Sequence, residues 1–240
     1  MAKKGHDGMK IDSRTIELFP SRTPGAPLVA LIAGDGEGRE VLDAVRAETR
    51  AEFSLAALED LRWDDDLSPW PQPALGPGES AFGGRAGSYL GWLTGHALPR
   101  VEAALNAPPA YTAIAGYSLG GLFALYALHK SDAFSRAASA SGSVWFPGFE
   151  EFVRDNPPRR RPDCVYLSVG NKERRAKYAA MRTVEDVTRR LADGYRAAGI
   201  PAMLEINPGG HFKDTVPRMA RAVARMLEGP TGFYIGKPLN

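Results

Sequence analysis

Cysteine is almost absent from this 240-residue sequence, in which Cys164 is the single example. One cysteine can form neither an intramolecular disulfide nor a metal site built from several thiolates. Cys164 opens the apolar run Cys-Val-Tyr-Leu, which favours a buried structural thiol over a reactive one. The sequence also lacks the His-Glu-x-x-His pattern and the paired-cysteine spacing of zinc sites. We therefore expect neither a metal nor a cofactor.

Neither charge nor hydrophobicity is concentrated in one part of the chain. Lys and Arg total 30 against 28 Asp and Glu, a formal net charge of +2, so overall charge does not indicate a nucleic-acid partner. No apolar stretch approaches the roughly 20 residues that span a bilayer. The polar, basic residues 1–10 also lack the apolar core of a secretory signal. We expect a soluble cytoplasmic protein without a membrane partner, and the sequence does not predict its oligomeric state.

The chain does contain a regular alternation of apolar, strand-like runs and amphipathic helical segments. Its composition, 44% hydrophobic and 24% charged, is that of a globular domain. Strands are expected at 15–19, 28–32, 53–58, 113–115, 164–169, 202–207 and from 137, and helices at 39–52, 87–105, 119–128, 150–154, 183–198 and 216–227. This alternation predicts an α/β fold with a mostly parallel sheet and helices on both faces. We expect a flexible leader over 1–12, one domain over 13–228 and a C-terminal tail over 229–240.

Residues 113–128 combine a short apolar run, a Gly-x-Ser-x-Gly turn centred on Ser118, and a helical segment of small and apolar residues. A sharp strand-to-helix turn of this kind exposes a serine hydroxyl above the sheet in serine hydrolases. Gly116 and Gly120 suit it, because side chains there would collide where strand and helix pass closely. We interpret Ser118 as a nucleophile; the alternative is a plain turn residue in a glycine-rich connection.

A serine hydroxyl needs an adjacent base, usually a histidine, to become a nucleophile at neutral pH. The sequence has four histidines. His6 lies in the leader, and His96 and His129 come from helical segments. His211 follows the last predicted strand on a Gly-Gly-His-Phe loop, where such a base is needed. We interpret His211 as the base.

The acid that orients the histidine follows the serine and precedes the histidine in chains with this turn. Glu173 lies just past the predicted strand 164–169 and meets that order. Asp214 lies three residues after His211 and is a local alternative, as is a Ser–His pair that works without an acid. The flanking Lys172 and Arg174 also allow Glu173 to belong to a solvated charge run.

Backbone amides are expected to stabilise the oxyanion that forms when the serine attacks a carbonyl group. One donor is the amide of Leu119, directly after the nucleophile, and the second comes from the glycine-rich loop 34–38, where Gly36 or the neighbouring Asp35 is expected. This loop has neither the lysine of a Walker loop nor the spacing of a dinucleotide fingerprint, so a nucleotide site is disfavoured.

The long loop from residue 63 to 78 carries two tryptophans, and loops of this length commonly serve a site. Trp63, Trp70 and the later Trp145 are candidates for the wall of an acyl or aromatic pocket; packing of the loop against the body is the alternative. Arg85 is a candidate partner for a substrate carboxylate, or for the acidic run 64–66. We name Trp145, Arg85 and Trp70 as candidate substrate-binding residues.

Seven segments in order along the chain carry a family resemblance: 33–37, 66–71, 82–84, 115–121, 141–147, 170–173 and 209–211. With them, the sequence resembles the putative esterase (esterase D-like) branch of the α/β hydrolases, which also holds enterobactin-type siderophore esterases and S-formylglutathione hydrolase. The resemblance implies an α/β-hydrolase fold without a large lid, Ser118 as nucleophile, His211 as base and Glu173 as acid. It also implies an oxyanion hole at the first glycine loop and Leu119. Many relatives carry aspartate at the position of Glu173, and some work with a Ser–His pair.

These expectations together describe a serine carboxylic-ester hydrolase that forms an acyl-enzyme. The expected partner is a small soluble ester, with a siderophore-type or other lactone ester as the named candidate. An acyltransferase of the same fold and a catalytically silent ligand-binding module remain the alternatives, because one fold supports many functions.

Overall fold

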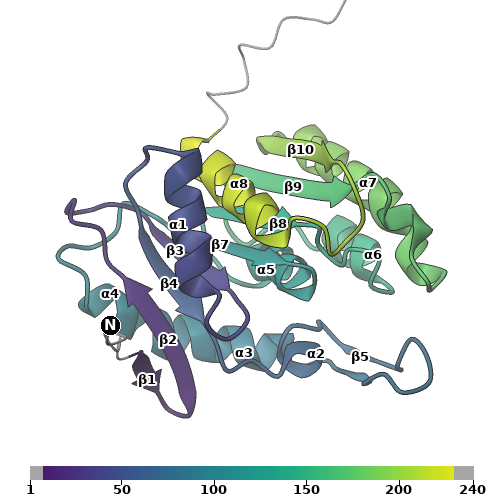
Figure 1. Ribbon diagram of the computed structural model, residues 1–240, viewed down its shortest axis with the longest axis horizontal. Helices are drawn as coiled ribbons and strands as arrows, with labels where there is room; N and C mark the ends of the chain where they lie inside the picture. The colour runs from purple at the N-terminus through teal and green to yellow at the C-terminus, as the bar shows by residue number, and fades with distance from the viewer. Residues whose placement is uncertain (1–7, 230–240) are drawn as a thin grey trace, which may run out of the picture.

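An eight-stranded sheet forms the centre of the molecule in the computed structural model, which describes residues 8–229 (Figure 1). Its strand order is β1-β2-β4-β3-β7-β8-β9-β10, and the six strands from β4 to β10 in this order pair in parallel. β1 and β2 add an antiparallel edge. The bounds are β1 (Met9–Ile11), β2 (Arg14–Phe19), β3 (Leu28–Ile32), β4 (Ser54–Leu58), β7 (Thr112–Tyr117), β8 (Arg136–Ala140), β9 (Cys164–Gly170) and β10 (Ala202–Asn207).

Helices cover both faces of the sheet, and each face has its own apolar core. On one face lie α1 (Gly38–Glu48) and α8 (Thr215–Glu228), drawn in front of the sheet in Figure 1. The other face carries α3 (Ala86–Trp92), the π-helix η1 (Leu93–Ala97), α4 (Leu98–Ala103), α5 (Leu119–Lys130), α6 (Phe149–Asp155) and α7 (Val184–Ala197). All five residues of β3 are buried, because alternate side chains enter the two cores. The predicted α/β class is confirmed.

The N-terminal part of the chain differs from the expectation of a flexible leader over residues 1–12. Met9–Ile11 forms β1 and pairs with β2, so a further strand lies outside the one predicted over 15–19. The physical reason is burial: Ile11 is 1% exposed and enters the core beneath α3 and α5. The rest of the expected leader, residues 1–7, and the expected tail beyond Gly229 lie outside the described residues.

The long loop after residue 62 contains short elements held together by buried polar groups. It holds α2 (Trp63–Asp66) and β5 (Pro71–Gln72), which pairs with β6 (Phe82–Gly83). Asp66 is buried, accepts hydrogen bonds from Arg62 and forms an ion pair with Arg14. Burial would raise the pKa of Asp66, but these two guanidinium groups outweigh it and hold the pKa below its usual value. Ser68 accepts a hydrogen bond from the amide of Gly84, which ties the two ends of this loop together.

Cys164 lies fully buried at the start of β9, as the sequence predicted. Burial raises the pKa of its thiol to about 11, which keeps the group protonated and unreactive at neutral pH. Across residues 8–229, no helix combines the length and the hydropathy that crossing a membrane requires.

The parallel strands all end at the same edge of the sheet, and the loops that follow them meet there. The loop after β3 holds the glycine-rich segment, the turn after β7 holds Ser118, and the loop after β9 leads into η2 (Glu173–Arg175). His211 follows β10, just before α8. Strand direction therefore brings the four predicted site segments to one place, as expected for open parallel sheets.

Candidate active site

Ser118 sits at the turn between β7 and α5 in a backbone conformation that residues other than glycine rarely adopt. Its φ is 56° and its ψ is −122°. Strain of this kind persists only where the surrounding structure enforces it. Here a Cβ at Gly116 would collide with the backbone of Gly120, so strand and helix approach closely, as the sequence predicted. The turn holds the Ser118 hydroxyl at the carboxyl edge of the sheet.

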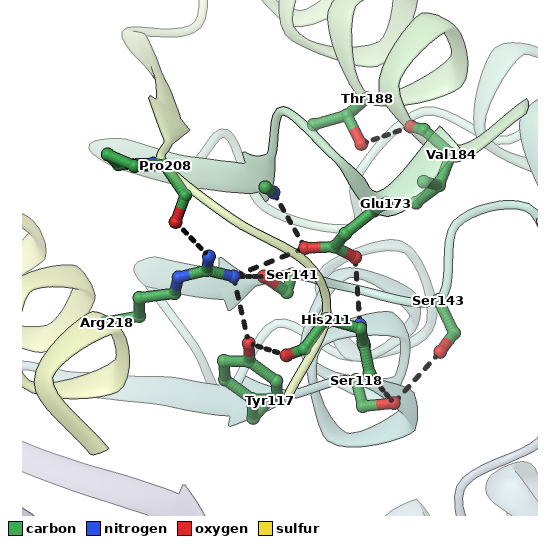
Figure 2. A network of polar contacts seen from close by, with 11 residues as sticks. Tyr117, Ser118, Ser141, Ser143, Glu173, Val184, Thr188, Pro208, His211 and Arg218 are labelled. Carbon is green, nitrogen blue, oxygen red and sulfur yellow. Dashed lines mark hydrogen bonds and ion pairs between the residues drawn. The ribbon is translucent and has the colours of Figure 1, made fainter. Parts of the chain in front are cut away.

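His211 contacts both Ser118 and Glu173, as Figure 2 shows. Its Nε2 lies 3.0 Å from the Ser118 Oγ, and its Nδ1 lies 2.8 Å from Oε2 of Glu173. An ionised carboxylate only accepts hydrogen bonds, so the proton of a neutral imidazole belongs on Nδ1. Nε2 is then free to accept a proton from the Ser118 hydroxyl. The structure thus brings together three predicted residues from three separate loops.

Asp214, the alternative acid, has no such contact. It precedes α8 with an exposed side chain and a left-handed backbone, and its backbone carbonyl accepts the amide of Arg218. Within residues 8–229, Glu173 is the carboxylate that hydrogen-bonds His211. The geometry favours Glu173 over Asp214 as the group that orients the imidazole.

Glu173 is 5% exposed, and both of its carboxylate oxygens have partners. Oε2 meets His211, while Oε1 accepts the amide of Gly170 at 2.7 Å. Burial would raise the pKa of Glu173, but its hydrogen bonds and the charge of His211 outweigh burial and lower the pKa below its usual value. The Glu173 side chain is therefore a carboxylate at neutral pH. Because it is buried, it does not belong to a solvated run of charges, which was the alternative from the sequence.

Arg218 of α8 connects the loops that carry the histidine and the acid (Figure 2). Its side chain is 3% exposed, and one terminal nitrogen, Nη1, lies 3.4 Å from Glu173 Oε1, 3.3 Å from the Tyr117 hydroxyl and 3.2 Å from Ser141 Oγ. The other, Nη2, donates to the carbonyl of Pro208 at 2.8 Å. The Tyr117 hydroxyl in turn donates to the backbone carbonyl of His211 at 2.5 Å. A single buried cation thus joins the loops after β9 and β10.

Sequence reasoning missed Arg218, because it lies in no motif. A signal was nevertheless present in the last predicted helix, where Arg218 shares the apolar face with Met219, Ala222 and Val223. Arginine is seldom fully buried unless it is paired, so its position on a core-facing stripe implies a buried anion. That anion is Glu173.

Ser143 is a second residue that sequence reasoning did not assign to the site. It is 3% exposed, its Oγ lies 3.2 Å from the Ser118 Oγ, and its amide donates to the Ser118 carbonyl at 2.9 Å. The Ser118 hydroxyl therefore has His211 as one neighbour and Ser143 as another. Together they restrict the rotation of the Ser118 side chain.

The glycine-rich loop after β3 differs in detail from the expectation for the oxyanion hole. The amide of Gly36, our first choice, donates to Oε1 of Glu59 at 3.0 Å, and that of Gly34 donates to Oε2 of Glu37 at 2.8 Å. In the described part of the chain, the amide of Asp35 donates to no group. Leu119 begins α5, where the first amides have no partner within the helix. The Gly36 amide is therefore committed to Glu59, and the amides of Asp35 and Leu119 remain the candidate donors.

Negative charge gathers around this loop. Burial and the neighbouring Glu17, Asp35 and Asp60 raise the pKa of Glu59, and the hydrogen bond from the Gly36 amide only partly offsets them. The amide of Asp60 donates to the Asp35 carboxylate at 3.1 Å.

Among the described side chains, no group of three or more His, Cys, Asp or Glu residues is arranged to hold a metal ion.

A cavity of about 320 Å³ opens beside Ser118 and His211. Trp63, one of the tryptophans expected from the sequence to form a pocket wall, lines this cavity. The three named substrate-binding candidates, Trp145, Arg85 and Trp70, do not line it. The Trp70 indole donates to the Pro147 carbonyl and packs edge-on against the rings of two phenylalanines, so it serves packing. Arg85 is exposed at the start of α3, and Trp145 packs against neighbouring aromatic rings.

Comparison with known proteins gives one family and a consistent set of folds. The family model described as "Putative esterase" matches residues 64–222. The uncharacterized protein YbbA of Bacillus subtilis (strain 168) is 27% identical over 195 residues, which cover 77% of this chain and 78% of YbbA. Among solved structures, the siderophore hydrolase EstA from Aspergillus nidulans superposes with a TM-score of 0.76 at 19% identity, covering 90% of each chain.

A second solved structure, an IroE-like serine hydrolase from Shewanella oneidensis, has a TM-score of 0.72 at 17% identity and covers 88% of this chain and 74% of its own. At these identities the structural likeness concerns the fold, which is that of the α/β hydrolases, as the sequence predicted. The family model spans more than half of the chain and includes the serine turn, the buried acid and the histidine loop. This chain therefore belongs to the putative esterase family.

Proposed function

We propose that the protein is a serine carboxylic-ester hydrolase that works through an acyl-enzyme. Ser118 is the nucleophile, His211 the general base, and Glu173 the carboxylate that orients the imidazole. The observation that carries the proposal is the chain of contacts from the Ser118 Oγ to His211 at 3.0 Å and on to Glu173 at 2.8 Å. These distances lie within hydrogen-bond range, as activation of a serine by a base requires.

The reaction has two steps. In the first step the Ser118 Oγ attacks the ester carbonyl while His211 Nε2 takes the proton of the Ser118 hydroxyl. The amides of Leu119 and Asp35 stabilise the oxyanion that forms. The imidazolium then gives its proton to the leaving alcohol as the carbon–oxygen bond breaks. In the second step His211 activates a water molecule, which releases the acid and restores Ser118. Glu173 stays ionised and stabilises the imidazolium in both steps.

Water is the acyl acceptor that the open site favours. The His211 side chain is 25% exposed, and the neighbouring Phe212 is 89% exposed, so solvent reaches the base. An acyltransferase has to exclude water from the acyl-enzyme. Product analysis with an added alcohol separates the two: we expect free acid to dominate, and ester exchange as the main product would indicate an acyltransferase instead.

A small soluble ester is the proposed substrate, and a siderophore-type or other lactone ester is the named candidate within that class. The structural likeness to a siderophore hydrolase supports testing this candidate first. A panel of p-nitrophenyl esters and lactones, followed by release of acid, tests the proposal. Turnover of at least one ester class supports it, and inertness toward the whole panel would contradict it.

Arg218 is proposed as a positioning residue for His211 and Glu173. In Arg218→Met the acid and histidine loops lose their common anchor and Glu173 loses a buried counter-charge. Because small misplacements of reacting groups cost about 100-fold in rate, we expect kcat to fall about 100-fold with a much smaller change in KM. Arg218→Lys keeps the charge and should recover part of kcat. Steady-state kinetics on the best ester measures both.

Arg221→Met is the matched control for this test. Arg221 lies one turn further along α8 and pairs with Glu205 at 3.0 Å, away from the triad residues. We expect its kcat to stay within about twofold, because this half-buried ion pair contacts none of the three proposed catalytic residues. Equal losses in Arg218→Met and Arg221→Met, or an Arg218→Lys variant no better than Arg218→Met, would contradict the positioning role.

A further inference from the structure

The cavity beside Ser118 runs toward the α1 and α8 side of the sheet. Its polar end consists of Ser118 and His211, and its walls come from the end of β3, the start of α1, α2 and the start of α8. Most of the wall is apolar and consists of Leu31, Ile32, Val41, Trp63, Val216 and Met219. Phe212 also lines the cavity; it is 89% exposed, and its ring lies perpendicular to the His211 ring.

The size of the cavity limits what can enter it. Its volume of about 320 Å³ is at the low end of small-molecule sites. At about 30 Å³ for a water-sized group, it holds roughly ten such groups. This suits a single medium-length chain or one small ring rather than a multi-ring ligand. The bulk of a larger ester would have to remain outside.

The charges at the cavity select against anions. The Glu37 carboxylate is part of the lining and accepts the amide of Gly34 at 2.8 Å. Two more carboxylates lie close by. Asp35 is in the same loop as Glu37, and Glu59 is hydrogen-bonded to that loop through the Gly36 amide. Within the described lining there is no lysine or arginine to pair with a substrate carboxylate. An anionic group entering here would lose its hydration and meet like charge.

We propose that this cavity receives an apolar, uncharged arm of the ester, equivalent to a medium-length alkyl chain. The inference rests on the proposed ester hydrolysis at Ser118 and adds its substrate class. Either side of the scissile bond can supply such an arm, so the experiment uses two ester series. One varies the acyl chain with a fixed alcohol, and the other varies the alcohol with a fixed acetyl group.

The expected result is a rise in kcat/KM of about fourfold per methylene in one of the two series, until the cavity is filled. Val216→Trp should shorten this range, because the half-buried Val216 lines the cavity at the start of α8. We compare kcat/KM for an ester with a six-carbon arm with kcat/KM for the ester with a two-carbon arm in the same series. We expect this ratio to be at least about tenfold lower in the variant than in the wild type. If this variant does not fold, the milder Val216→Phe carries the same test.

Val153→Trp is the matched control. Val153 is also half-buried, on α6, and packs against the other core. Its chain-length profile should equal that of the wild type. Flat profiles in both wild-type series, or the same profile in Val216→Trp and Val153→Trp, would overturn the inference while ester hydrolysis stands. If the wild type turned over none of the esters, both the cavity inference and the proposed ester hydrolysis would be overturned.

The charge of the arm has its own test. The test uses the ester series that shows the rise with chain length. In that series the wild type should hydrolyse the ester with the uncharged arm at least about tenfold better than an ester whose arm ends in a carboxylate, such as a butyrate against a hemisuccinate ester in the acyl series. Glu37→Gln keeps an oxygen for the Gly34 amide and removes the negative charge, so it should reduce this preference severalfold. Equal rates on the two esters in the wild type would contradict the uncharged arm.

Discussion

Ser118→Ala and His211→Ala should each lower kcat/KM for the best ester by about a millionfold, the loss measured when a nucleophile or its base is removed from a serine hydrolase. The reason is mutual dependence: the hydroxyl is a poor nucleophile without His211, and His211 has no serine proton to accept without Ser118. The double variant should therefore be no slower than either single variant. Hydrolysis of a p-nitrophenyl ester by the purified, folded variants measures this.

Two matched substitutions control for the loss of a serine and of a histidine elsewhere. Ser131 caps the far end of α5, and His96 is exposed on η1. Ser131→Ala and His96→Ala should keep activity within about twofold. Losses in Ser118→Ala and His211→Ala that multiply in the double variant would show that the two residues act independently. That outcome would contradict the proposed pair.

Glu173→Gln should lower kcat about 10⁴-fold with the fold intact, as replacing the acid of a serine hydrolase by its amide does. The amide can donate to Nδ1 of His211, which places the imidazole proton on Nε2. Nε2 then cannot accept the proton of Ser118. The variant also removes the negative charge that stabilises the imidazolium. Steady-state kinetics and a melting curve separate the chemical effect from instability.

Asp214→Asn is the paired variant for this prediction. Its side chain is exposed and does not contact His211 in the described structure, so activity should change less than about threefold. A larger loss in Asp214→Asn than in Glu173→Gln would assign the acid to Asp214. Small effects in both would mean that Ser118 and His211 work without an acid, the remaining alternative from the sequence.

Most of the strands of the large sheet, the longer helices and the three proposed catalytic residues could be predicted from the sequence for one physical reason. Apolar runs such as 28–32 and 164–169 indicate buried parallel strands, and such strands end at one edge. A serine, an acid and a histidine that each follow a strand therefore converge. Glu173, rather than Asp214, follows from the same rule, because it lies just past the end of β9.

The partners of individual groups could not be predicted, because they depend on packing between distant segments. The Gly36 amide is occupied by Glu59, which comes from the end of β4. Trp63 lines the cavity while Trp70 packs against Phe146, although both lie in one loop and have the same residue type. Their difference arises from the buried contacts of Asp66 and Ser68, which set the path of the loop.

Helix α8 contributes both to the triad and to the cavity, and the local sequence pattern of this helix does not reveal the two roles. Its buried Arg218 joins the loops of Glu173 and His211, and Val216 and Met219 line the cavity. Substitutions at the start of α8 should therefore separate into two groups. Those at Arg218 should change kcat, and those at Val216 should change the preferred ester.

The most direct test of the central claim is labelling of the folded protein with a fluorophosphonate, read by intact mass and peptide mapping. Such a reagent reacts with a serine only when a base activates it. The wild type should gain one adduct, mapped to the peptide that contains Ser118, and Ser118→Ala should gain none. No adduct on the folded wild type, or an unchanged adduct on Ser118→Ala, would contradict Ser118 as the activated nucleophile.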